Sequence, residues 1–155
     1  MGPIGIWCDT IAALILSIAI EVGVPPNFVL AIATVENWTL NPNAINNKNT
    51  NGTIDYGVMQ INSVHNLKNW RDPETNIRFG AAYIRHLAER MPYGSTWGEV
   101  AIAYNAGMGR LYTPPASTVK YSSNVMLRYT ELNGGYACPL VKRQWVDTER
   151  RIVYR

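Results

Sequence analysis

A helix is predicted at residues 27–37, which read NFVLAIATVEN and follow two consecutive prolines. Phe28, Ile32 and Val35 recur at the spacing of one helical face, so this segment should bury an apolar stripe. The prolines mark a sharp start, and Asn27 is a candidate cap for the first turn.

Glu36 lies at the end of this predicted helix, on the side that carries Val29, Ile32 and Ala33. Apolar surroundings remove water from a carboxyl group, which disfavours its charged form and raises its pKa. Such a group stays protonated near neutral pH and can act as a general acid. On this segment alone, a helix-end glutamate paired with an arginine is the alternative.

The run at residues 11–20 is the most membrane-like part of the sequence, within a helix predicted at residues 10–22. A membrane-spanning helix needs about 20 apolar residues, whereas this run is shorter, contains Ser17 and precedes Glu21. No Lys or Arg precedes it, so it also lacks the charged start of a signal peptide. A buried core helix is expected.

Two further helices are indicated by their start signals. Asp72 and Pro73 form an N-cap followed by a proline at the first helical position. The apolar positions that follow have a helical period: Ile77, Ala81, Ile84, Leu87 and Met91. Thr96 and Glu99 fit a capping box for the next helix, which is expected to end at Gly107.

A last helix is predicted at residues 117–132, with Val119, Met126 and Tyr129 facing inward. Beyond the glycine pair at residues 134–135 the tail alternates weakly between apolar and polar residues, so a strand could form there.

Residues 41–56 are rich in asparagine and contain Asn51-Gly52, the strongest short hairpin signal. A mainly α fold with one small β-hairpin or ordered loop is therefore expected. Residues 47–52 also resemble the start of a calcium loop, but the ligand positions are Asn instead of Asp, and Val58 stands where a Glu is needed. We predict no metal site.

The composition fits one globular domain over residues 1–155. Charged residues make up 16% and apolar residues 47%, which excludes a disordered chain and a coiled coil. Residues 1–141 carry nine basic and nine acidic side chains, so the net charge of +3 arises in the C-terminal tail. A neutral body lacks the basic face of a nucleic-acid-binding domain. The tail is expected to be a solvated end, with contact to an acidic surface as the alternative.

Three motifs occur in order along the chain: Glu36-Asn37, Gly57-Val58-Met59-Gln60-Ile61-Asn62 and Ala103-Tyr104-Asn105-Ala106-Gly107. They are accompanied by NPNAIN at residues 41–46, Asn76-Ile77, WGEV at residues 97–100 and Tyr121. Each motif alone is weak, but their order and spacing make a strong signal. Over residues 8–130 the sequence resembles the lytic transglycosylase family, whose fold is that of goose-type lysozyme. It is most similar to the small members that accompany secretion and conjugation machines.

The resemblance implies a lysozyme-like α+β domain with its core at residues 8–132 and a C-terminal extension at residues 133–155. It implies that Glu36 is the sole catalytic carboxylate and needs no cofactor. Glu36 would protonate the oxygen that joins N-acetylmuramic acid to N-acetylglucosamine in peptidoglycan. As a base, it would then take the proton of the muramyl 6-hydroxyl, giving a 1,6-anhydro sugar, while the substrate's N-acetyl oxygen would stabilise the sugar cation.

The resemblance also implies substrate-binding roles for the following residues: Asp55, Gly57, Met59, Gln60, Asn62, Tyr104, Asn105 and Tyr121. Gly57 would let the backbone approach a sugar, and Met59 would line the acetyl pocket. Gln60 and Asn62 would offer amide donors and acceptors to the sugar. Core packing is the alternative for Met59.

Tyr104 would hydrogen-bond to Glu36 and orient it, with core packing again as the alternative. Asn105 would brace its loop, and Tyr121 would stack or bond near the acetamide. His65 and His86 have no other metal-ligating residue at the right spacing, so both are expected at the surface or in packing.

The sequence departs from the family pattern at two places. Asn37 stands where a serine is usual after the glutamate. Cys8 matches a cysteine of small relatives, but Glu74 stands where its partner is usual, which leaves Cys138 as the other candidate. A Cys8–Cys138 disulfide would suit an oxidising compartment, and two free thiols are an equally open reading.

Two other functions stay open. Asp55, at the end of the predicted hairpin, could act with Glu36 in a hydrolytic muramidase that releases a reducing sugar, or it could simply cap the hairpin. A non-catalytic peptidoglycan-binding or assembly module is the third reading. The presence of Glu36, Gln60 and Tyr104 together argues against it, because a pure binder has no need of the acid.

The expected partners follow from the resemblance. They are peptidoglycan glycan strands and a secretion, conjugation or phage tail machine, with no nucleic acid and no integral membrane segment. A monomer in the periplasm or associated with the cell envelope is expected, a location inferred from the substrate since no signal peptide is visible.

Overall fold

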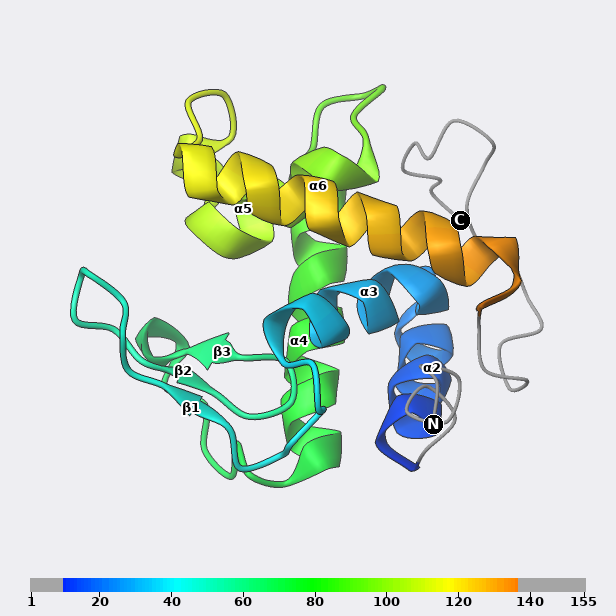
Figure 1. Ribbon diagram of the computed structural model, residues 1–155, viewed down its shortest axis with the longest axis vertical. Helices are drawn as coiled ribbons and strands as arrows, with labels where there is room; N and C mark the ends of the chain where they lie inside the picture. The colour runs from blue at the N-terminus through cyan, green and yellow to red at the C-terminus, as the bar shows by residue number, and fades with distance from the viewer. Residues whose placement is uncertain (1–9, 137–155) are drawn as a thin grey trace.

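The structure is a computed structural model that describes residues 10–136. Its helices are α2 (Thr10–Val22), α3 (Pro26–Glu36), α4 (Pro73–Arg90), α5 (Trp97–Ala106) and α6 (Ala116–Glu131). Strands β1 (Ile45–Asn46), β2 (Asp55–Tyr56) and β3 (Ile61–Asn62) form a small antiparallel sheet. Three short turns complete the fold: η1 (Ser63–His65), η2 (Met108–Arg110) and the π-helical η3 (Leu132–Tyr136). The predicted mainly helical α+β fold is confirmed, and Figure 1 shows the sheet beside α3 and α4, away from α2.

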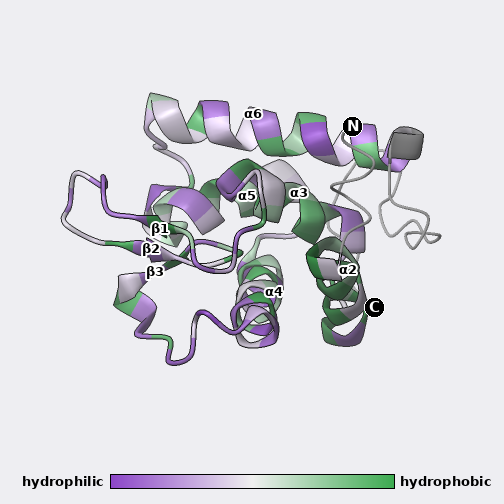
Figure 2. Ribbon diagram, turned by 60° about the horizontal axis from the view of Figure 1, so that its bottom comes forward, coloured by the Kyte–Doolittle hydropathy of each residue, from purple (hydrophilic) through white to green (hydrophobic). Residues whose placement is uncertain are grey.

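Helix α3 is the buried centre of the described part of the chain. Residues 26–34 are all buried, and the helix packs against α2 and α6. Figure 2 shows that hydrophobic residues dominate α2 and α3, whereas the long hairpin is largely hydrophilic. Full burial of one large apolar side chain contributes about 1.5–3 kcal/mol, so α3 is firmly anchored. Its last residue, Glu36, therefore starts from a rigid backbone.

The start of α3 differs from the prediction. Pro25 takes the N-cap position without a side-chain hydrogen bond, and Pro26 occupies the first helical position, where a missing N–H is harmless. Asn27 is therefore not a cap. It is buried inside the helix, and its Nδ2 donates to Oδ1 of Asn133 at 2.8 Å.

The start signals of α4 and α5 are confirmed. Oδ2 of Asp72 accepts from the backbone N–H of Thr75 at 3.0 Å, with a proline in the first turn. Thr96 and Glu99 form the predicted capping box, and α5 ends at Gly107 with φ 87°. Both helices begin where short-range hydrogen bonds satisfy the first N–H groups.

The inward face of α6 was only partly predicted. Tyr129 is buried as expected, but Val119 is 47% exposed, so its inward placement was wrong. Small polar residues take the core positions instead, and Oγ of Ser122 donates to the carbonyl oxygen of Gly98 on α5 at 2.7 Å. Val119 lies outside this contact and faces solvent, while Met126 is partly buried.

The sheet has one strand more than the predicted hairpin. Strand β1 pairs with β2, and β2 also pairs with β3, which places Asp55 opposite Asn62 and Tyr56 opposite Ile61. Each strand has two residues, too few for sequence alternation to reveal a strand. The extra pairing brings two polar residues of the predicted site side by side.

Asn76, buried in α4, holds the sheet against the helices. Its Oδ1 accepts from the backbone N–H of Met59 at 2.8 Å, and its Nδ2 donates to the carbonyl oxygens of Tyr56 at 3.0 Å and Trp70 at 3.2 Å. A Cβ on Gly57 would collide with this amide, and Gly57 has φ 77°, a conformation that favours glycine. In this structure the group that approaches Gly57 closely is the Asn76 side chain, and that contact by itself requires a glycine.

Several predictions lie outside the described residues. They are the pairing of Cys8 and Cys138 and a strand in the tail beyond residue 136. Within residues 10–136, no helix is long and apolar enough to cross a bilayer.

Candidate active site

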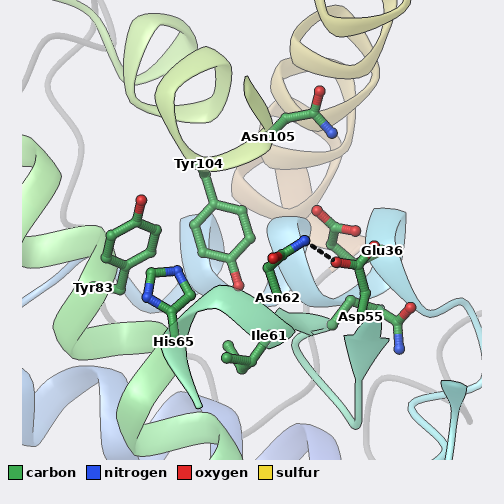
Figure 3. A pocket seen from close by; sticks show the side chains of 9 residues that line it. Glu36, Asp55, Ile61, Asn62, His65, Tyr83, Tyr104 and Asn105 are labelled. Atoms are coloured by element: carbon green, nitrogen blue, oxygen red, sulfur yellow. Dashed lines mark hydrogen bonds between the residues drawn. The ribbon is translucent and has the colours of Figure 1, made fainter. Parts of the chain in front are cut away.

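A cleft opens where the end of α3, the sheet and helices α4 and α5 meet (Figure 3). It is lined by Glu36, Asp55, Gln60, Ile61, Asn62, His65, Tyr83, Tyr104 and Asn105. Five of the eight predicted substrate-binding residues are thus brought together with Glu36, although they come from segments far apart in the sequence.

Glu36 is the last residue of α3 and is half-buried at the wall of the cleft. The next residue, Asn37, is buried, and its Nδ2 donates to the carbonyl oxygens of Asn41 at 2.8 Å and Gly57 at 3.4 Å. These bonds tie the end of α3 to the base of the hairpin. The asparagine that departs from the family pattern thus helps to position the carboxyl group.

Burial is the main cause that raises the pKa of Glu36 from 4.5 to about 8, and the negative charge of Asp55 adds to it. The C-terminal end of a helix also disfavours a negative charge. The Tyr121 hydroxyl opposes these effects as a hydrogen-bonding neighbour. Glu36 is therefore protonated at neutral pH, the state required of a general acid.

Tyr121 of α6 lies next to Glu36 but does not line the cleft. Its buried hydroxyl makes no hydrogen bond of ordinary geometry within the described residues. Burial and the nearby Glu36 raise the pKa of Tyr121 well above 10, so the hydroxyl keeps its proton. It is the donor best placed to stabilise Glu36 when that carboxyl ionises.

Asp55 is held by amide side chains from three parts of the hairpin and sheet. Its Oδ1 accepts from Nδ2 of Asn62 at 2.9 Å (Figure 3), and its Oδ2 accepts from Nδ2 of Asn49 at 3.0 Å and of Asn46 at 3.3 Å. Hydrogen bonds to both oxygens fix the orientation of the carboxyl group. The asparagine-rich hairpin therefore holds the Asp55 side chain at one place in the cleft.

Gln60 and Asn62 use most of their amide groups inside the protein. Nδ2 of Asn62 also donates to Thr53 at 3.0 Å, and its Oδ1 accepts from the backbone N–H of Val64 at 3.1 Å. Nε2 of Gln60 donates to the carbonyl oxygen of Gly57 at 3.0 Å. Donation of both amides to a sugar was predicted, but Asn62 mainly positions Asp55.

Tyr104 does not hydrogen-bond to Glu36 as predicted. Its hydroxyl donates to the carbonyl oxygen of Met59 at 2.8 Å, which ties α5 to the turn between β2 and β3. Asn105 accepts a hydrogen bond from Oγ1 of Thr118 at 2.7 Å and so links α5 to the start of α6.

Met59 does not line the cleft. Its side chain is fully buried against Gly80 of α4, where an added Cβ would lie 2.9 Å from its Cε. The core-packing alternative therefore describes Met59 better than a role in an acetyl pocket.

His65 and Tyr83 line the cleft, although the sequence did not indicate either as a site residue. The His65 ring packs edge-on against Tyr83 at 4.9 Å and tilted against Phe79 at 5.1 Å, between ring centroids. Burial lowers the pKa of His65, so the ring is neutral at physiological pH. Tyr83 lies four residues after Phe79 on α4, and that aromatic spacing was the one available signal.

Comparison with known proteins gives the family to which this fold and cleft belong. Residues 14–126 match the family described as the Transglycosylase SLT domain, so the chain belongs to this transglycosylase family. The predicted family is thereby confirmed. The members of this family are enzymes that act on peptidoglycan in the cell envelope.

Two relatives share similar sequences. Protein IpgF of Shigella flexneri is 32% identical over 123 residues, which cover 70% of this chain and 74% of the relative, and Protein IpgF of Shigella sonnei gives the same figures. A solved structure of lytic transglycosylase Slt from Pseudomonas aeruginosa, an inactive Glu-to-Gln variant, superposes with a TM-score of 0.64 at 21% identity. It covers 90% of this chain, which spans only 26% of that larger protein, so the likeness concerns the fold.

Proposed function

We propose that the chain is a lytic transglycosylase that cleaves the β-1,4 bond between N-acetylmuramic acid and N-acetylglucosamine in peptidoglycan, with Glu36 as general acid and base. The observation that carries this proposal is a carboxyl group with a pKa of about 8 at the wall of a cleft. Membership of the transglycosylase family supports the same reaction.

In the first step, Glu36 gives its proton to the bridging oxygen as the bond to the muramyl anomeric carbon breaks. The N-acetyl oxygen of the substrate stabilises the positive charge at that carbon. Glu36, now ionised in surroundings that disfavour its charge, takes the proton of the muramyl 6-hydroxyl. That oxygen bonds to the anomeric carbon, which gives the 1,6-anhydro sugar and restores the acid. Holding the reactants in line can lower the barrier by about 7–11 kcal/mol.

Asp55 has an electrostatic role in this mechanism. Both of its oxygens accept amide hydrogen bonds, so its carboxylate is a fixed charge and a poor nucleophile. That charge adds to burial, which is the main cause of the raised pKa of Glu36. A hydrolytic muramidase is the second candidate, favoured by the presence of Asp55 in the same cleft.

Asp55→Asn is expected to leave a lyase active and to shift its pH profile. Removing the charge of Asp55 lowers the pKa of Glu36, so the loss of kcat/KM on the alkaline side should move down by about 0.5–1 pH unit. The measurement is kcat/KM on solubilised glycan strands from pH 5 to 10. A fall of 100-fold or more at every pH would instead indicate a hydrolase that needs this carboxylate.

Product analysis separates the candidate functions directly. Purified sacculi are digested with the wild-type protein and, as a control, with Glu36→Gln, and the soluble products are examined by mass spectrometry. We expect 1,6-anhydro-muropeptides from the wild type alone. Reducing muropeptides would support the muramidase, and no released product would support a non-catalytic binding module.

The wider setting is also proposed from family membership. Because the substrate is peptidoglycan, we place the protein in the periplasm or at the cell envelope, acting as a monomer with one domain over residues 1–155 and residues 133–155 as an extension. A secretion, conjugation or phage tail machine would use such an enzyme to open the wall locally.

A further inference from the structure

The tip of the hairpin between β1 and β2 carries an Asn-Gly pair in an open place. Asn51 and Gly52 are both exposed, and nothing lies within 4 Å of the position that a Cβ on Gly52 would take. Figure 1 shows this hairpin extending away from the helices. Because glycine has no side chain to hinder its backbone nitrogen, the Gly52 nitrogen can approach the Asn51 side chain.

Two donors point at the side-chain oxygen of Asn51. Its Oδ1 accepts from the backbone N–H of Thr53 at 3.1 Å and from the Thr53 hydroxyl at 2.7 Å. These distances are those of an oxyanion hole, in which donors stabilise a carbonyl oxygen as it gains negative charge. The arrangement makes the amide carbon of Asn51 more open to attack by a nucleophile.

The surroundings of Thr53 hold its hydroxyl in this donating orientation. The same oxygen accepts from Nδ2 of Asn49 at 3.3 Å and from Nδ2 of Asn62 at 3.0 Å. These two bonds use both lone pairs of the hydroxyl, so its single proton is directed at Asn51.

The attacking nitrogen is only weakly held. The backbone N–H of Gly52 donates to the carbonyl oxygen of Asn49 at 3.2 Å, at the long end of the usual range. Breaking one exposed hydrogen bond costs little, because water takes the place of the lost partner.

We propose that Asn51 is a site of spontaneous deamidation and that Thr53 accelerates the reaction. The backbone nitrogen of Gly52 gives its proton to water and bonds to Cγ of Asn51, while the side-chain nitrogen takes up a proton and leaves as ammonia. Water then opens the five-membered imide at one of its two carbonyl carbons, which leaves aspartate or isoaspartate at position 51. The net change is hydrolysis of one amide, and no peptidoglycan takes part, so this inference is independent of the proposed function.

Peptide mapping by mass spectrometry follows the reaction in the folded wild-type protein during incubation at mildly alkaline pH. The peptide that carries Asn51 should gain the mass that replaces NH2 by OH, and a part of the product should be isoaspartate. Asn51→Gln should abolish this gain, because glutamine cannot close a five-membered ring. A wild-type peptide that keeps its mass would overturn the proposal.

The chain contains a matched control in a second Asn-Gly pair, Asn133-Gly134. Asn133 is half-buried in the π-helical turn η3, and its Oδ1 accepts from Nδ2 of Asn27 at 2.8 Å. Its peptide should gain mass much more slowly, because the helical turn holds the backbone away from the attacking geometry. Equal rates at the two pairs would show that the dipeptide alone sets the rate, against a role for the hairpin.

Variants of Thr53 test the acceleration. Thr53→Val keeps the size of the side chain but removes the hydroxyl, and it should slow deamidation of Asn51 by about 3-fold to 10-fold, the worth of one hydrogen bond. Thr53→Ser should retain most of the wild-type rate. A hairpin that is merely loosened would react faster, so an unchanged or higher rate in Thr53→Val would overturn the role of Thr53. Circular dichroism confirms that each variant is folded.

Nuclear magnetic resonance of the modified protein gives a second readout. Isoaspartate lengthens the main chain by one carbon, so position 51 can no longer face both donors of Thr53. The side-chain amide signals of Asn49 and Asn62 should then shift, since both amides donate to the same hydroxyl. Unchanged signals would show that this hydroxyl is not coupled to position 51, against the proposed pair of donors.

Discussion

Glu36→Gln is expected to lower the rate of glycan cleavage by about 10³-fold or more. A general acid or base contributes roughly 10²–10⁴-fold, and Glu36 serves in both steps of the proposed reaction. Glutamine keeps the size and polarity of the side chain but can neither donate the proton to the bridging oxygen nor take it from the 6-hydroxyl. The measurement is release of soluble muropeptides from sacculi under identical conditions.

The same substitution should raise the free energy of unfolding at alkaline pH. The pKa of Glu36 is about 8 in the folded protein and 4.5 in the reference state, so between these values the folded state binds the proton that the unfolded state has lost. Stability from this group is full below pH 4.5 and is lost as the pH rises through 8. Glutamine does not ionise, so its advantage should grow over this window by on the order of 2 to 4 kcal/mol.

Denaturant unfolding of both proteins at several pH values from 4 to 9 measures this difference. Glu89→Gln is the matched control, because Glu89 is an exposed glutamate of α4. Its stability should follow that of the wild type within about 0.5 kcal/mol. Parallel pH curves for Glu36→Gln and the wild type would contradict the raised pKa, and residual cleavage near the wild-type rate would remove Glu36 from the mechanism.

Asn76→Ala is expected to destabilise the protein by about 3–5 kcal/mol. The substitution leaves the N–H of Met59 and the carbonyl oxygens of Tyr56 and Trp70 without their partner, and an unsatisfied buried polar group costs about 1–3 kcal/mol. Domains of this size are stable by only about 5–15 kcal/mol. A large part of the total stability should therefore be lost.

Urea unfolding monitored by circular dichroism gives the measurement. Asn124→Ala on the exposed face of α6 is the control, and its effect should be within about 0.5 kcal/mol. Asn76 holds the turn that carries Met59, and the carbonyl oxygen of Met59 in turn accepts the hydrogen bond of Tyr104. In Asn76→Ala the cleft should therefore lose its structure at a lower urea concentration than the helices. A decrease in the free energy of unfolding of less than about 1 kcal/mol would show that water replaces the hydrogen bonds of the Asn76 amide.

The elements of this fold could be predicted wherever the signal is local. The caps at Asp72 and Thr96 act within three residues, and the period of apolar residues in α4 reports which face is buried. The placement of Val119 failed because the buried face of α6 depends on its contact with α5, a contact between helices that no single segment encodes.

The candidate site shows the same division. The direction of the pKa shift of Glu36 could be predicted, since its apolar neighbours precede it within one or two helical turns. The family resemblance was only partly correct about the residues that surround Glu36. Tyr104 bonds to Met59 instead of to the acid, and Met59 packs in the core, because both outcomes depend on how α4 and α5 meet the sheet. The packing of α4 and α5 against the sheet also places His65 and Tyr83 at the cleft.

The sequence alone therefore specifies where the helices start and which carboxyl group lies on an apolar helix face, because hydrogen bonds and side-chain spacing along one helix act over a few residues. The tertiary structure specifies what surrounds that acid. Asp55 is fixed by amides 6, 7 and 9 positions away in the chain, and Tyr121 reaches Glu36 from another helix. Charge and desolvation depend on distance in space, so the raised pKa of Glu36 exists only once these segments have packed together.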